Sequence, residues 1–278
     1  MPAAGCLFLC LSFLAASGDA RASCTLEDGA RAQAVEIVDG DTVVLENGRQ
    51  VRFTGIQAPK LPLGRANFEA WPLAAEARDA LSAMTLGKTV SLHHGGRRDD
   101  RHGRILAHVF VAGGDGASLW LQQELLRLGL ARVYTFRDNR ACAAELLAVE
   151  GEARQARRGI WADPFYEIRD AADEQALDRL HGRFELVEGR VMSAAVVRGR
   201  IYLNFGEDWR RDFTVTVAPR DARLFLDDPI WRTLLDAADG QPGLEGRRVR
   251  VRGWLGRYNG PEMTLTHPEQ IELLDDMS

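Results

Sequence analysis

A hairpin pattern near the start of the chain most constrains the fold. Ala34–Leu45 and Gln50–Ile56 alternate in polarity and are rich in β-branched residues, and a Glu46-Asn47-Gly48 turn separates them. Asn-Gly between two alternating segments is a strong signal for a tight β-turn. The region therefore predicts two antiparallel strands with one buried face.

The chain after this hairpin alternates between helical and strand patterns. Apolar residues spaced three and four apart predict amphipathic helices, and short β-branched segments predict strands. The expected helices are Leu73–Leu86, Ser118–Gly129 and Ala141–Arg158, and the expected strands are Thr89–Leu92 and Arg104–Val111. Gly87 and Gly129 stand where these helices are expected to stop.

The last part of the chain is a second β-rich region. Residues 164–182 are acidic and polar and predict a helical linker, and residues 183–275 follow as a second domain. The expected strands are Arg183–Val197, Arg200–Phe205, Asp212–Val217, Arg247–Arg257 and Glu262–Leu265, with one helix around Ala222–Ala238. Five strands with a helix between the third and the fourth is the chain order of an OB-fold barrel.

The N-terminus predicts export. Cys6–Ser17 is an uncharged apolar run that is too short to span a bilayer, and an A-x-A cleavage signal follows at residues 20–22. We expect residues 1–22 to be a signal peptide cut before Ser23, so that the mature chain is secreted or periplasmic. Cleavage before Cys24, as in a lipoprotein, is the alternative.

Export changes what the cysteines predict. Cys24 and Cys142 are the two that remain in the mature chain. In an oxidising compartment a single pair usually forms a disulfide, which we expect here. Two buried thiols are the alternative.

Composition limits the classes of protein. With 46% hydrophobic and 27% charged residues, the chain is globular rather than disordered, collagen-like or coiled-coil. A formal net charge of −5 argues against a protein that coats nucleic acid through its overall charge. Any polyanion binding must therefore come from local clusters of basic residues.

The densest group of polar residues lies in the first predicted strand. Asp39 and Asp41 are two positions apart, so on a strand they point to the same face. Two carboxylates there repel each other unless a cation lies between them, and Ca²⁺ prefers oxygen ligands. A turn with solvated carboxylates is an equally good interpretation. Arg52 and Arg104 are placed to meet across a barrel, where two arginines stabilise the transition state of phosphoryl transfer.

Taken together, Ala34 to Trp161 resemble the staphylococcal nuclease (thermonuclease) family. The matching segments are Val-Asp-Gly-Asp-Thr at 38–42, Val-Arg-x-x-Gly-Ile-x-x-Pro at 51–59, Asp-Arg-His-Gly-Arg at 100–104, Gly-Leu-Ala-Arg-Val at 129–133 and Arg-Gly-Ile-Trp at 158–161. The resemblance implies a five-stranded OB barrel with three α-helices over residues 31–163. The expected fold class is therefore mainly β with helices, in two OB-fold barrels. The resemblance also implies Ca²⁺-dependent hydrolysis of phosphodiesters in DNA and RNA.

The resemblance also implies residue roles. Asp41 matches a calcium ligand, and Asp39 an acidic residue near the metal. Arg52 and Arg104 match the two phosphate-binding, transition-state arginines. Tyr134 matches a tyrosine segment that borders the nucleotide pocket, and Arg101 in the same charged turn as Arg104 is expected to bind substrate.

Two positions depart from the family pattern. Gln57 stands where the family has a calcium-ligating aspartate, and Lys60 stands where it has the general-base glutamate. Calcium affinity follows the number of carboxylates, and a protonated lysine cannot accept a proton. We expect Lys60 to attract phosphate or to replace the metal electrostatically.

The second domain resembles nucleic-acid-binding OB folds. Arg200, Tyr202 and Asn204 alternate on one strand, and Arg250 and Arg252 do so on another. Basic and aromatic groups on one barrel face suit single-strand binding, so Arg200 and Tyr202 are expected to contact substrate. The same alternation is also what any half-buried strand shows.

Two functions remain open at this stage. One is a nuclease in which Asp41, Arg52 and Arg104 act on phosphate, with weak or lost activity because of Gln57 and Lys60. The other is a non-catalytic nucleic-acid-binding or envelope interaction protein built on a degenerate nuclease. In both, the expected partner is nucleic acid, and any Ca²⁺ is expected to bind weakly.

Overall fold

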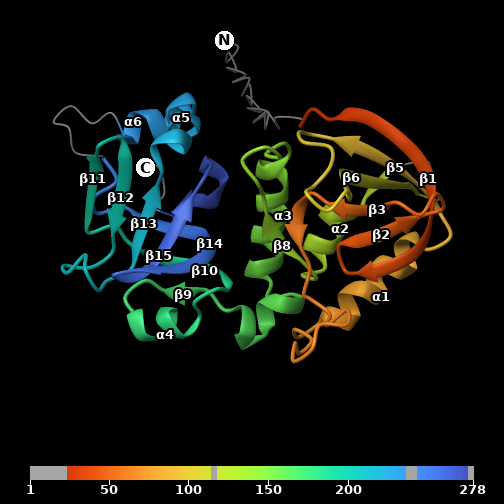
Figure 1. Ribbon diagram of the computed structural model, residues 1–278, viewed down its shortest axis with the longest axis horizontal. Coiled ribbons are helices and arrows are strands. Elements are labelled where there is room, and N and C mark those ends of the chain that lie inside the picture. The colour runs from red at the N-terminus through yellow and green to blue at the C-terminus, as the bar shows by residue number, and fades with distance from the viewer. Residues whose placement is uncertain (1–23, 114–117, 236–242, 275–278) are drawn as a thin grey trace, which may run out of the picture.

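The computed structural model describes residues 24–113, 118–235 and 243–274, and it contains two β-barrels that lie side by side (Figure 1). The expected signal peptide lies outside the described residues. Helix α3 (Ala143–Gln155) and strand β8 (Arg132–Tyr134) of the first barrel face the second barrel. Within the described ranges, no helix is both long and apolar enough to cross a membrane.

The first barrel closes through a parallel pair of strands. Its main sheet has the order β3-β2-β1-β5-β6-β7, and β3 also pairs with β6 in parallel. The strands are β1 (Glu27–Asp39), β2 (Thr42–Leu45), β3 (Gln50–Phe53), β5 (Thr89–His94), β6 (Ile105–Ala112) and β7 (Ser118–Trp120). A separate pair is formed by β4 (Gly55–Gln57) and β8. Helices α1 (Ala74–Thr85), α2 (Leu121–Arg127) and α3 complete the unit.

The first predicted strand is wrong in one respect that matters for function. Ala34–Leu45 is two strands, because β1 ends at Asp39 and β2 starts at Thr42, paired with it across a tight turn. Asp39 and Asp41 therefore do not alternate along one strand. A Cβ on Gly40, inside this turn, would come within 2.7 Å of Ala58 and of Ala77, so only glycine lets the turn pack against α1.

The second barrel repeats the same strand order. Strands follow the path β11-β12-β13-β15-β14-β10-β9, and β13 pairs with β15 in parallel. They are β9 (Arg169–Asp170), β10 (Phe184–Arg190), β11 (Ser193–Val197), β12 (Arg200–Asn204), β13 (Thr214–Val217), β14 (Arg248–Tyr258), β15 (Gly260–Leu265) and β16 (Ile271–Leu273). The expected strand Arg183–Val197 is interrupted at residues 191–192, so β10 and β11 together form the first OB strand and β12, β13, β14 and β15 follow. Antiparallel pairing of β10 with β14 and parallel pairing of β13 with β15 then match the OB chain order. The predicted fold class, mainly β with helices, is confirmed.

Two local expectations in this region are wrong. The stretch 164–182 is not one helix, because only α4 (Glu174–Arg179) is α-helical and β9 pairs with β10. The single helix expected around Ala222–Ala238 is two, α5 (Pro219–Asp227) and α6 (Pro229–Leu235). Pro229 has no N–H to continue α5, and the Asp228 side chain accepts hydrogen bonds from the first free N–H groups of α6.

Buried ion pairs join the two barrels. Arg252 on β14 is 1% exposed and donates to both carboxylate oxygens of Glu150 on α3, each at 3.0 Å. Glu150 also accepts a hydrogen bond from the backbone N–H of Val133, so it is held from both barrels. Arg250 pairs with Glu188 and Glu272. The alternation of Arg250 and Arg252 thus serves an internal network, and the expected binding surface on that strand is wrong.

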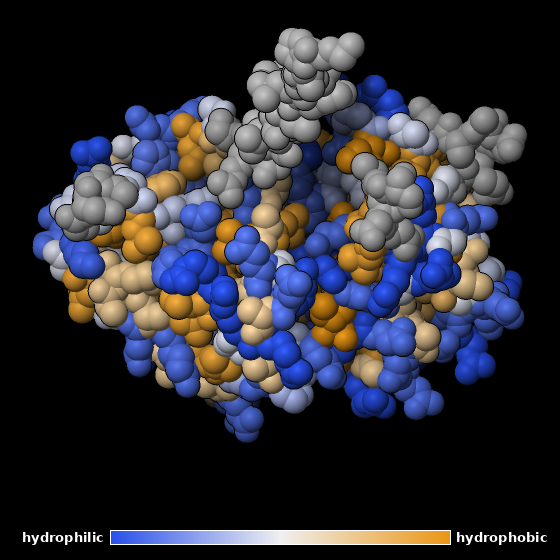
Figure 2. All heavy atoms as spheres, turned by 180° about the vertical axis from the view of Figure 1, so that it is seen from behind, coloured by the Kyte–Doolittle hydropathy of each residue, from blue (hydrophilic) through white to orange (hydrophobic). Residues whose placement is uncertain are grey.

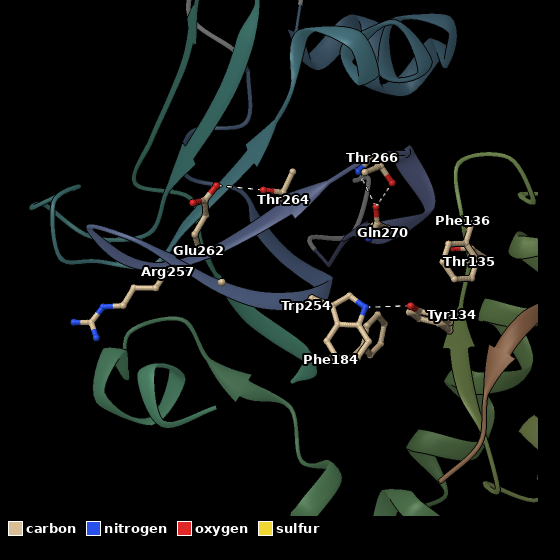
Figure 3. Close-up of a pocket in the computed structure, with 11 residues that line it drawn as sticks. Tyr134, Thr135, Phe136, Phe184, Trp254, Arg257, Glu262, Thr264, Thr266 and Gln270 are labelled. Atoms are coloured by element: carbon tan, nitrogen blue, oxygen red, sulfur yellow. Dashed lines mark hydrogen bonds between the residues drawn. The ribbon is translucent and has the colours of Figure 1, made fainter. Parts of the chain in front are cut away.

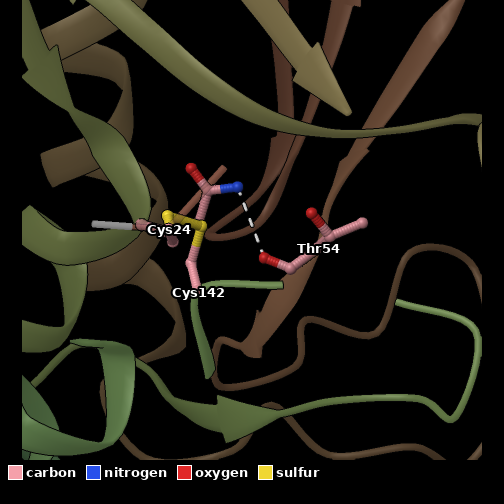
Figure 4. Close-up of a disulfide and its surroundings, with 4 residues drawn as sticks. Cys24, Thr54 and Cys142 are labelled. Carbon is pink, nitrogen blue, oxygen red and sulfur yellow. Dashed lines mark hydrogen bonds between the residues drawn. A yellow bond between two sulfur atoms is a disulfide. The ribbon is translucent and has the colours of Figure 1, made fainter. Parts of the chain in front are cut away.

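A disulfide ties the start of the described chain to α3. Cys24 and Cys142 are bonded, at a separation of 118 positions in sequence (Figure 4). Cys142 immediately precedes α3, the helix that carries Glu150. The cross-link therefore fixes the N-terminal strand to the element that contacts the second barrel.

The surface of the protein mixes polar and apolar residues. On the face seen in Figure 2, hydrophilic residues predominate and hydrophobic ones form scattered groups. Such a surface offers no single large apolar patch on this face.

Breaking the disulfide should destabilise the protein. In the chain-entropy model a loop of this length contributes roughly 4–5 kcal/mol to the free energy of unfolding. Urea unfolding of the oxidised protein with and without reductant measures the difference. Thiol titration of unfolded, unreduced protein should find no free thiol among Cys24 and Cys142, and two reactive thiols would contradict the cross-link.

Removing Arg252 should cost more than removing an exposed arginine. Arg252→Ala leaves the buried Glu150 with Arg154 as its remaining ion-pair partner, and we expect the variant to lower the free energy of unfolding by about 3 kcal/mol. Arg223→Ala is the control, because the Arg223 side chain is 88% exposed. Equal stabilities of the two variants in urea unfolding would show that the network does not hold the barrels together.

Candidate functional site

The turn between β1 and β2 buries two carboxylates. Asp39 is 5% exposed and Asp41 is fully buried, so the interpretation as a solvated turn is wrong although the turn itself exists. The Asp41 backbone N–H donates to Asp39 Oδ1 at 3.1 Å, and the Ala58 N–H donates to Asp41 Oδ2 at 2.7 Å. The turn is thereby joined to the segment that follows β4.

Lys60 brings an ammonium group to these carboxylates. Its Nζ lies 3.0 and 2.8 Å from the two oxygens of Asp41 and 3.5 Å from Asp39 Oδ2. Arg52 on β3 approaches from the other side, with Nη2 3.3 Å from Asp41 Oδ2. The same Nη2 donates to the Ile56 carbonyl at 2.7 Å, which fixes the guanidinium in place.

The two carboxylates differ in their electrostatics. Burial alone would raise the pKa of Asp41, but Arg52 and Lys60 together hold it well below its usual range. The pKa of Asp39 is raised, because burial and the adjacent Asp41 charge outweigh the attraction of Lys60 and Arg52. Asp41 is therefore the permanent anion of the group.

Gln57 is engaged away from this cluster. Its Oε1 accepts hydrogen bonds from Arg132 Nε at 3.2 Å and Nη2 at 2.9 Å. Arg132 is buried, and its guanidinium lies 4.7 Å from the ring centre of Phe184 in the second barrel. Burial lowers the pKa of Arg132 to about 10. The Gln57 oxygen that was expected to help bind calcium therefore accepts hydrogen bonds from the Arg132 guanidinium instead.

These residues do not fit a hard divalent cation. Calcium needs six or more oxygens and gains affinity from each carboxylate. Here the ammonium of Lys60 already contacts the oxygens of both aspartates, and the Gln57 oxygen faces Arg132. In the described ranges, no group of three or more His, Cys, Asp or Glu residues is arranged to hold a metal ion.

The charged turn before β6 holds Arg104 in an ion pair. Arg104 Nε donates to Asp100 Oδ2 at 2.7 Å, and the other oxygen of Asp100 accepts the backbone N–H groups of His102 and Arg104. Burial would raise the pKa of Asp100, but these hydrogen bonds lower it. Arg101 is exposed and donates to the His102 ring at 3.0 Å. Arg104 immediately precedes β6, and the first residue of β6, Ile105, pairs with Val51 of β3, so the fold places the backbone of Arg104 close to that of Arg52.

A cavity opens beside Lys60. Its volume is about 460 Å³, and it lies between the first barrel and the start of the second. The lining residues are Gln57, Lys60, Arg65, Phe68, Trp71, Phe165, Gly182, Arg183 and Trp254. Among these described residues three are cationic and none is acidic. Arg65, Arg183 and Trp254 were not expected from the sequence as site residues.

The remaining expected substrate contacts lie in two places. Tyr134 lines a neighbouring cavity, where its hydroxyl accepts a hydrogen bond from Trp254 Nε1 at 3.1 Å. Arg200 and Tyr202 are on β12, and Tyr202 lines a third cavity, on the second barrel. The fold therefore places Tyr134, and not Arg200 or Tyr202, next to the Lys60 cavity.

Sequence comparisons agree with this architecture. The sequence model of the staphylococcal nuclease homologue family matches residues 50–163. The chain is 31% identical to an uncharacterized endonuclease of Escherichia coli over 132 residues, which are 46% of this chain and 75% of that protein. It is 26% identical to the thermonuclease of Staphylococcus hyicus over 132 residues, 46% of this chain and 74% of that protein.

The first barrel and the sequence similarity of residues 50–163 together define a nuclease-like protein. The chain belongs to the staphylococcal nuclease family. A micrococcal nuclease of Shigella flexneri is similar over a comparable range, at 30% identity over 141 residues, 48% of this chain and 75% of that protein. These matches cover less than half of the chain, so they do not describe the second barrel.

Replacing Lys60 should change how stability depends on pH. A depressed Asp41 pKa stabilises the fold above its unfolded value of 3.8, and this contribution is lost as pH falls below that value. In Lys60→Met the folded pKa of Asp41 rises, so we expect the variant to be roughly 1–3 kcal/mol less stable at pH 7. The difference in stability between the variant and wild type should narrow towards pH 3, because Asp41 becomes protonated at a higher pH in the variant than in wild type.

Urea unfolding across this pH range measures both effects. Lys88→Met is the matched control, since Lys88 is exposed in the turn before β5. A Lys60→Met variant as stable as wild type at pH 7 would mean that the ammonium does not neutralise Asp41.

Proposed function

We propose that this protein is a nucleic-acid-binding member of the staphylococcal nuclease family in which Lys60 replaces the catalytic metal. Phosphodiester hydrolysis is then far slower than in a member with the full set of carboxylates. The single observation that carries this proposal is the contact of Lys60 Nζ with both oxygens of Asp41, at 3.0 and 2.8 Å.

The chemistry of the Lys60 side chain supports a loss of catalysis. A general base must accept a proton from the attacking water, and an ammonium group has no lone pair with which to accept one. Such a base contributes roughly 10²–10⁴-fold to the rate. The lining of the Lys60 cavity, as described, offers no carboxylate in its place.

The charges around the cavity support binding of phosphate. Lys60, Arg65 and Arg183 line it, and Arg52 lies beside Lys60 at Asp41. Arginine and lysine are the residues that neutralise backbone phosphates, and their effect does not require a metal. Local cations thus offset the net negative charge of the chain.

The N-terminal sequence supports a proposal for the compartment in which the protein acts. We propose that residues 1–22 are removed before Ser23 and that the mature protein is secreted or periplasmic. A bonded Cys24–Cys142 pair supports this, because disulfides persist in oxidising compartments.

The test of this function is a pair of assays on the mature protein. Fluorescence anisotropy with labelled single-stranded DNA should show binding that is equally strong in EDTA and in CaCl₂ and that weakens with salt. Digestion of the same DNA should proceed near background in both conditions. Robust calcium-dependent cleavage, abolished by Arg52→Ala, would overturn the proposal.

Restoring the carboxylates should restore a calcium site. Gln57→Asp combined with Lys60→Glu removes the ammonium and adds two anions, so calcium titration should show tighter binding than wild type and cleavage should rise. Gln57→Asp alone is the control, because Lys60 still holds Asp41 in that variant. A double variant that folds but neither binds calcium nor cleaves DNA would show that the likeness to the nuclease family is one of fold only.

A further inference from the structure

Trp254 links two cavities at the junction of the barrels. It projects from β14 of the second barrel and lines both the Lys60 cavity, of about 460 Å³, and a neighbouring one of about 450 Å³. The second cavity is also lined by Tyr134 and Phe136 of the first barrel and by Phe184 of the second (Figure 3). We call the two cavities together the junction groove.

We propose that the second barrel completes the binding site: a single strand of nucleic acid lies in the junction groove, with a base stacked on Trp254. The inference rests on the proposed function, because it assumes that the Lys60 cavity receives a phosphate. It goes further by giving the second barrel a direct part in recognition and by fixing the form of the substrate.

The two halves of the junction groove differ in chemistry. The Lys60 cavity carries the cations Lys60, Arg65 and Arg183. Lys60 is paired with Asp41 and Arg183 with Glu185, whereas Arg65 donates to backbone carbonyls, so its charge is the best placed for a backbone phosphate. The neighbouring cavity is lined by four aromatic side chains, which suit bases. Phosphate contacts on one side and stacking platforms on the other are what a single strand requires, because its bases are unpaired.

The aromatic side chains are arranged as a fixed surface. Trp254 is 50% exposed, and its indole N–H donates to the Tyr134 hydroxyl, which anchors the ring across the domain boundary. Phe184 lies edge-on to Tyr134 at 4.8 Å between ring centres and to Trp254 at 6.1 Å. Rings held in this way lose little freedom when a base stacks on them.

Ion pairs keep the two walls of the groove at a constant separation. Besides Arg252 with Glu150, Arg140 of the first barrel pairs with Glu269 of the second at 2.8 Å. Thr135 Oγ1, next to Tyr134, is 2.7 Å from the ring of His267. Burial lowers the pKa of His267 to about 4, so the imidazole is neutral at pH 7 and this contact does not change near neutrality.

The outer face of the second barrel is a poorer site for nucleic acid. Its cavity, of about 480 Å³, includes Tyr202, Trp209 and Tyr258, but its described lining contains no basic residue. Glu262 lines both this cavity and the aromatic cavity of the junction groove, where Arg257 accompanies it, so the difference in charge comes from the basic residues alone. Charge therefore favours the junction groove over the face that carries Arg200 and Tyr202.

Two tryptophans with nearly equal exposed fractions provide matched variants for the test. Trp254 in the junction groove and Trp209 on the outer face are 50% and 51% exposed. Binding of a fluorescein-labelled single-stranded 12-mer is measured by anisotropy in EDTA for Trp254→Ala, Trp209→Ala and Trp254→Phe. Loss of one stacked base predicts affinity about 5- to 100-fold weaker for Trp254→Ala. Trp209→Ala should stay within about twofold of wild type, and Trp254→Phe should retain most of the affinity.

Each outcome decides the inference. If Trp254→Ala binds as tightly as wild type, the inference is overturned while the proposed function stands. The same holds if Trp209→Ala loses as much affinity as Trp254→Ala. Tighter binding of a duplex of the same length also overturns it. A wild-type protein that binds neither form overturns the proposed function itself. Circular dichroism of the variants confirms that they are folded, and Trp254→Phe tests stacking where the alanine variant is unstable.

Discussion

The ammonium group of Lys60 neutralises a carboxylate that solvent does not reach. Asp41 is fully buried in the turn between β1 and β2, so an ionised group there is stable only with cations within a few ångströms. A divalent metal is one solution, and a lysine with an arginine is another. Lys60 and Arg52 supply the second solution, in which the ammonium group contacts both Asp39 and Asp41 and the guanidinium contacts Asp41.

A second set of buried charges has a comparable role between the barrels. Glu150 contacts Arg252 and the backbone of β8 at once, and β8 carries Arg132, which holds Gln57. The position of the second barrel is therefore coupled to the side of the site that faces Lys60. This coupling explains why a wall of the cavity comes from residues 183 and 254, far from the nuclease region in sequence.

Much of the fold was predictable from local patterns, and the site only in part. Alternation and turn residues indicated the strands of both barrels, but the bend at Gly40 was missed because Asp-Gly-Asp-Thr fits a strand and a turn equally well. Gln57 and Lys60, which stand in place of a calcium-ligating aspartate and a general-base glutamate, indicated from the sequence that the metal is replaced. The partners of Arg132, Arg252 and Trp254 were not predictable, since periodicity gives the face of a strand and not what a separate domain places against it.

The central claim is that Lys60 stands in for the metal, and thermal unfolding in the presence of calcium tests it most directly. A cation that binds only the folded state raises the melting temperature with its concentration. For the wild-type mature protein at pH 7, the account predicts the same melting temperature in EDTA and in millimolar CaCl₂, within about 1 °C. A rise of several degrees with calcium, removed by Asp41→Asn, would contradict the account.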